Sequence, residues 1–214
     1  IIVVEGDGLF SFDGTIFTQL GQAPPTGAAV AVISGGSLTD ANNYRIGLTF
    51  YSTITGFESN VFESEQVTTA APNRQIEITS IPTTASNATI DTVRVYIKNV
   101  TTNSAYLFVA EIDLGIASYT VAANSISTQT PPTKNAPPIT GGAKYLTVFG
   151  KKIAYAGNSN FLSEAFISEE YLPDAFDSTT TQIVLQVPGQ GPITGIATGL
   201  YNDTLLTPFL VVFK

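Results

Sequence analysis

Short apolar segments bounded by turn residues recur about every ten residues along this chain, and this cadence limits the folds that it can adopt. The clearest example is residues 92–100 (TVRVYIKNV), in which Val93, Val95 and Ile97 alternate with other side chains. Alternation with a period of two is typical of a strand that turns one face to the core. Long stretches rich in Glu, Lys and Leu, which favour helices, are missing. The cadence therefore predicts an all-β fold.

The composition indicates a folded protein with an acidic surface. Of the 214 residues, 43% are hydrophobic and 12% are charged, and the formal net charge of −8 is spread along the chain. Tight binding of nucleic acid requires clustered Lys and Arg, so this charge distribution argues against it. The distribution remains compatible with a surface past which DNA moves without being held.

The residues needed for most catalytic chemistry are missing. The chain has no Cys and no His, which removes disulfides, thiolate metal sites and the commonest general base. A serine triad is therefore impossible, and no G-x-S-x-G motif occurs. We predict a protein that is not an enzyme, with no catalytic, cofactor-binding or metal-binding residues. No apolar run of 18 residues occurs, so we expect no membrane span.

Two Pro-rich breaks predict how the chain is organised. Residues 22–27 (QAPPTG) and 129–138 (QTPPTKNAPP) enclose about seven predicted strands, the number expected of an immunoglobulin-like sandwich. We predict that residues 22–138 form a β-sandwich inserted between residues 1–21, a three-stranded meander, and residues 139–214, its continuation.

The flanking segments predict β-propeller-like blades. Residues 144–177 contain two or three short strands and an acidic arm, and further strands are expected at 183–187, 193–197 and 209–213. The 21 residues before Gln22 and the 71 from Lys144 onward have the length of about two blades. A propeller needs at least four blades, so we expect an incomplete propeller that leans on other subunits or belongs to a longer chain. Because the sequence lacks Met, Ile1 is not expected to be a translation start.

Three sets of acidic residues resemble catalytic or metal sites. Glu63 and Glu65 share one predicted strand face, and Glu169 and Glu170 open the acidic arm, where we expect a short helical turn. Asp7 and Asp13 lie six residues apart but lack the remaining spacing of a calcium loop. Solvated edges and turns explain all three sets better than a site does.

Other surface features leave more than one interpretation open. Three sequons begin at Asn87, Asn99 and Asn202, although the chain is so rich in Thr that coincidence also explains them. Tyr51 and Tyr96 are predicted to point outward, either toward a glycan or a neighbouring subunit, or into simple cross-strand packing.

Several short motifs occur in an order that resembles bacteriophage virion proteins. Residues 23–121 resemble a fibronectin type III-like domain, with NYRIGLTFY at 43–51, TGFES at 55–59 and IDTVRVY at 90–96. The flanks resemble the propeller-like blades of the same proteins. Their motifs are AFISEEYLPDAFD at 165–177, PITGI at 192–196 and LVVFK at 210–214.

This resemblance implies a tail nozzle, hub or muzzle component of a short-tailed phage. Such a protein is a structural part of the virion, forms a homo-oligomeric ring with other tail proteins, and surrounds the channel through which DNA leaves. The alternative is a secreted or cell-surface adhesion or glycan-binding module, which the sequons and the sandwich would also suit. A glycan-degrading enzyme with a propeller core is the third interpretation.

Overall fold

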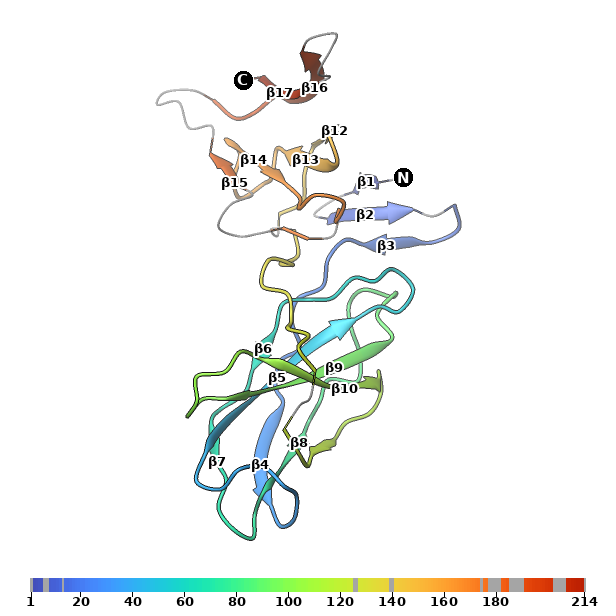
Figure 1. Cartoon of the computed structure of the whole chain (residues 1–214). Helices are drawn as coiled ribbons and strands as arrows, with labels where there is room; N and C mark the ends of the chain where they lie inside the picture. Colours follow the sequence, from blue (N-terminus) through green and yellow to red (C-terminus); the bar gives the residue numbers. More distant parts are fainter. Residues whose placement is uncertain are drawn as a thin grey trace. The chain divides into compact units, whose positions relative to one another are not determined.

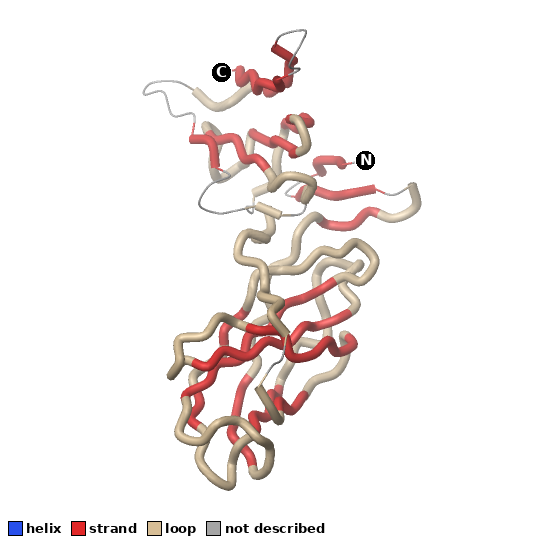
Figure 2. The backbone as a smooth tube through the Cα atoms, viewed as in Figure 1, coloured by secondary structure: helices blue, strands red, loops and turns tan. Residues whose placement is uncertain are grey.

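Strands and loops make up the part of the chain that the structure describes. A computed structural model describes residues 2–5, 8–12, 14–124, 127–138, 141–173, 175–176, 182–184, 191–201 and 207–213. Every regular element among these residues is a strand, as the tube in Figure 2 shows. The prediction of an all-β fold is therefore confirmed. Within the described ranges, no helix is long and apolar enough to cross a membrane.

Contacts within the chain divide it into two compact units. Unit 1 joins Ile1–Gly21 to Lys134–Lys214, and unit 2 is Gln22–Thr133. Unit 2 therefore ends at Thr133, whereas the sequence predicts that the sandwich ends at Pro138. The reason lies in Ala136, whose carbonyl oxygen accepts a hydrogen bond of 2.8 Å from the Phe176 N–H and so holds the end of the Pro-rich segment in unit 1.

Unit 2 contains two antiparallel sheets (Figure 1). The larger has the order β10-β9-β5-β6, with β7 also pairing with β5, and the smaller has the order β11-β8-β4. The strands are β4 (Ala29–Ile33), β5 (Asn43–Tyr51), β6 (Phe62–Glu63), β7 (Val67–Thr68), β8 (Gln75–Thr79), β9 (Thr92–Asn99), β10 (Leu107–Asp113) and β11 (Tyr119–Val121).

Alternating side chains from both sheets form one core in unit 2. In β9, Val93, Val95 and Ile97 are buried in this core, as their spacing predicts. The smaller sheet contributes Ile76 and Ile78 from β8 to the same cluster. Because residues of both sheets share the cluster, the two sheets pack face to face. The opposite face of the larger sheet carries the polar and aromatic side chains described below.

Unit 1 contains three separate antiparallel sheets, called here the first, middle and last sheets (Figure 1). The first sheet has the order β1-β2-β3, the middle sheet β12-β13-β14-β15, and the last sheet pairs β16 with β17. The strands are β1 (Ile2–Glu5), β2 (Gly8–Phe12), β3 (Phe17–Gln19), β12 (Tyr145–Phe149), β13 (Lys152–Ala156), β14 (Glu164–Ile167), β15 (Gln182–Val184), β16 (Gly195–Tyr201) and β17 (Thr207–Phe213).

The middle sheet packs against another sheet on each of its faces. Tyr155 and Phe166 pack in one cluster with Leu9 and Leu20, which come from the first sheet and its end. The neighbouring residues of the same strands, Ala156 and Ala165, pack on the other face; that cluster contains Ile193, Ile196 and Val212, the last two from the last sheet. The three sheets are therefore stacked with the middle sheet between the other two. The middle sheet turns Tyr155 and Phe166 toward the first sheet, and Ala156, Ala165 and Tyr145 toward the last.

Residues 57–69 form only the two short strands β6 and β7. At Ser64, which follows β6, the hydroxyl accepts a hydrogen bond of 2.9 Å from the Ile46 N–H. One local prediction differs from the structure. The helical turn expected at Glu169 is instead a tight turn, in which Tyr171 has a φ of 61° and Glu169 pairs with Leu172. Asp174 and Asp177 of the arm lie outside the described residues.

Candidate functional site

A cluster of polar side chains lies on the outer face of the larger sheet of unit 2, with the carboxylate of Glu58 at its centre. Glu58 is only 7% exposed. Its Oε1 accepts hydrogen bonds from the Thr49 hydroxyl, at 2.7 Å, and from the Tyr96 hydroxyl. Its Oε2 lies 2.8 Å from Nη1 of Arg94. Two strands, β5 and β9, and the loop that carries Glu58 therefore meet at one buried carboxylate.

Arg94 lies between two carboxylates and over an aromatic ring. Its Nε lies 2.8 Å from Oε2 of Glu111, on the neighbouring strand β10, and its guanidinium carbon is 3.3 Å from the centre of the Tyr51 ring. Although burial opposes the charge, hydrogen bonds to Glu111 and Glu58 raise the pKa of Arg94 above its ordinary value. The guanidinium is therefore permanently charged and fixed in orientation.

A second cluster continues the same face around Glu63. Its carboxylate pairs with Arg45 of β5 and accepts a hydrogen bond of 2.7 Å from the Tyr106 hydroxyl. The Tyr106 hydrogen bond, followed by the charge and hydrogen bond of Arg45, lowers the pKa of Glu63 against the opposing effect of burial. Burial and the Glu63 hydrogen bond raise the pKa of Tyr106. The ring of Tyr106 lies close beside Gly47, where a Cβ would come within 3.0 Å of it.

The polar side chains of this face are bound to one another. The described residues contain no buried side-chain nitrogen or oxygen without a hydrogen-bond partner, and no group of three residues that could hold a metal. The carboxylate of Glu58 accepts hydrogen bonds from both Arg94 and Tyr96. Tyr96 lies on the outer face, as predicted, but it is 0% exposed and so offers no surface to a glycan or a neighbouring subunit. Of the predicted alternatives, the structure shows cross-strand packing, against Phe108 directly opposite on β10. Tyr96 is buried because its hydroxyl reaches Glu58 and its ring packs edge-on against Phe108 at 5.8 Å.

The predicted carboxylate pairs do not form paired sites. Glu63 ends β6, so Glu65 does not share its strand, and the prediction of a common strand face is wrong. Glu170 is half-exposed and pairs with Lys151 at 3.1 Å. Lys151 lies in the turn between β12 and β13, with its Nζ 4.5 Å from the Tyr171 ring centre. This contact ties the acidic arm to the neighbouring turn.

The three predicted sequons differ in their surroundings. Asn87 is 2% exposed, and its Oδ1 accepts hydrogen bonds from the N–H and the hydroxyl of Thr89, the third residue of the sequon. Asn99 is partly exposed, and its Oδ1 accepts a hydrogen bond from the Thr102 N–H. Asn202, together with Asp7 and Asp13, lies outside the described residues. The buried Asn87 has no room for a glycan in this conformation.

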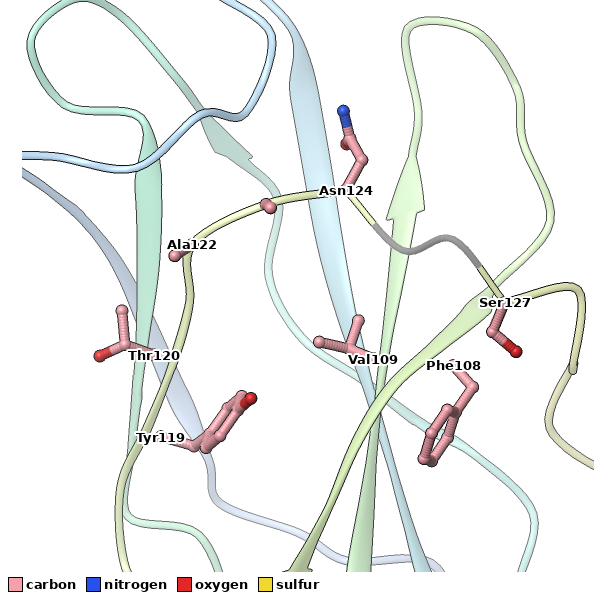
Figure 3. A pocket seen from close by; sticks show the side chains of 8 residues that line it. Phe108, Val109, Tyr119, Thr120, Ala122, Asn124 and Ser127 are labelled. Atoms are coloured by element: carbon pink, nitrogen blue, oxygen red, sulfur yellow. The ribbon is translucent and has the colours of Figure 1, made fainter.

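A shallow cleft opens beside β10 and β11 in unit 2 (Figure 3). It has a volume of about 420 Å³ and is lined by Phe108 and Val109 of β10, Tyr119 and Thr120 of β11, and residues that follow β11. None of the residues that line it is charged. The cleft therefore presents no carboxylate, ammonium or guanidinium group among the described residues.

Apolar exposure is concentrated in unit 1. Ten large apolar side chains are exposed among the described residues, and eight of them belong to unit 1. Unit 2 contributes only Ile54 and Ile116. In unit 1 they include Phe17, 54% exposed on the first sheet, and Phe213, 51% exposed on the last sheet.

No protein-family model matches the chain, and no curated protein matches it either.

Proposed function

We propose that the protein is a structural component of the tail of a short-tailed bacteriophage, of the nozzle, hub or muzzle kind. In this proposal several copies form a ring, together with other tail proteins, around the channel through which DNA leaves the virion. The observation that carries the proposal is the exposed apolar surface at both ends of the sheet stack in unit 1. Such surface suits permanent contacts between subunits.

The proposal assigns a fold to each unit. Unit 2 is an immunoglobulin- or fibronectin III-like sandwich, supported by its two face-to-face antiparallel sheets. Unit 1 is propeller-like, supported by the antiparallel meander of β12, β13, β14 and β15, which packs against a neighbouring sheet on each face. The sandwich is inserted between two parts of the propeller-like unit.

The motifs that resemble phage virion proteins have a common structural basis in unit 2. Glu58 belongs to TGFES, whereas Arg94 and Tyr96 belong to IDTVRVY. These three residues bind one another in the buried cluster. Motifs that are distant in sequence are therefore joined in space, which supports treating them as one pattern.

The distribution of charge suits a channel that does not hold DNA. All three arginines of the sequence pair with carboxylates: Arg45 with Glu63, Arg74 with Asp40, and Arg94 with Glu58 and Glu111. Bidentate guanidinium groups are the strongest phosphate ligands among side chains, and here they are already occupied. Because the chain also has a net charge of −8, we propose that it forms a channel wall past which DNA slides.

Labelling of particles tests this proposal. Antibodies raised against the chain should bind at one end of purified phage particles, and its peptides should occur in the digested particles. Failure to find the chain in particles would contradict the proposal. Antibody binding to the host cell surface or to the culture fluid would instead support an adhesion module.

A further inference from the structure

We draw no further inference here: the strongest candidate, the shallow cleft of unit 2 beside the edge strands β10 and β11, carries none, because its uncharged lining specifies no ligand and nothing in the structure shows what covers it.

Discussion

Nη1 of Arg94 lies 2.8 Å from Oε2 of Glu58, and the two side chains are only 15% and 9% exposed. The residues are 36 positions apart in the sequence and belong to two different short motifs. The pair lies on the outer face of the larger sheet, where the sequence predicts solvent. Its burial makes this face a second, polar core of unit 2.

Removal of one partner of this pair should destabilise unit 2 strongly. We expect Arg94→Met to lower the free energy of unfolding by about 3–5 kcal/mol, because the buried carboxylate of Glu58 loses its counter-charge. Denaturant unfolding followed by tyrosine fluorescence measures this loss. Arg74→Met is the matched control, since Arg74 pairs with Asp40 at the surface and should change stability by less than about 1 kcal/mol. Equal effects of the two substitutions would contradict the structural role of the buried pair.

Stability should fall at acid pH partly because of Glu63 and Asp91. Hydrogen bonds and charge from Tyr106 and Arg45 lower the pKa of Glu63. The pKa of Asp91 is also lowered, because hydrogen bonds from the side chain and the N–H of Thr53 outweigh burial. A carboxyl whose pKa is lowered by folding stabilises the protein above its unfolded pKa, and this stabilisation is lost as the pH falls through the folded pKa.

The measurement is the free energy of unfolding as a function of pH between 7 and 3. We expect the decrease toward acid pH to be smaller in Glu63→Gln and in Asp91→Asn than in the parent chain. Glu65→Gln, at an exposed position, is the control and should leave the slope unchanged. If the unfolding free energy of E63Q and of D91N depends on pH as steeply as that of the parent chain, neither carboxyl is linked to folding.

Two glycines with similar backbone angles should differ in their tolerance of alanine. Gly36 and Gly56 have φ of +77° and +74°, so alanine is strained at either position by about 1–2 kcal/mol. At Gly56 a Cβ meets open space, whereas at Gly36 it would lie 2.4 Å from the Arg74 carbonyl oxygen. Gly36→Ala should therefore lower the melting temperature clearly more than Gly56→Ala. Equal melting temperatures would contradict the close approach of these two backbone segments.

The contact between the middle and last sheets should not accept a larger residue at position 165. Ala165 is 0% exposed and packs against the last sheet, so Ala165→Leu should cost about 1–3 kcal/mol of unfolding free energy by overpacking. Val148 of β12 is 63% exposed in the same sheet, and Val148→Leu is the control expected to have little effect. If Leu at position 165 is tolerated as well as at 148, the sheets do not pack as described.

Much of the fold was predictable because strand alternation is a local signal. The alternation in residues 92–100 predicts both the strand and the residues that enter the core. The end of β6 before Ser64 was not predictable. It depends on a hydrogen bond that the Ile46 N–H, in another part of the chain, donates to the Ser64 hydroxyl. The burial of Tyr96 was missed for the same reason: only the folded structure brings Glu58 to its hydroxyl.

The candidate interaction surfaces could be found only from the structure. The sequence shows Phe10, Phe12 and Phe17 as ordinary strand residues, and alternation assigns them to a face without saying whether that face is covered. Packing of the middle sheet against another sheet on each face, compared with exposure of Phe17 and Phe213, distinguishes covered from uncovered surface. The aromatic content of the sequence was a partial signal, since it exceeds what a small core demands.

The molar mass of the purified 214-residue chain in solution is the most direct test of this account, because self-association is its central claim. Light scattering across a range of concentrations should give a discrete whole-number multiple of the 22.6 kDa monomer mass, and that mass should fall to 22.6 kDa in Phe17→Ser. A parent chain that measures 22.6 kDa at every concentration would contradict the account.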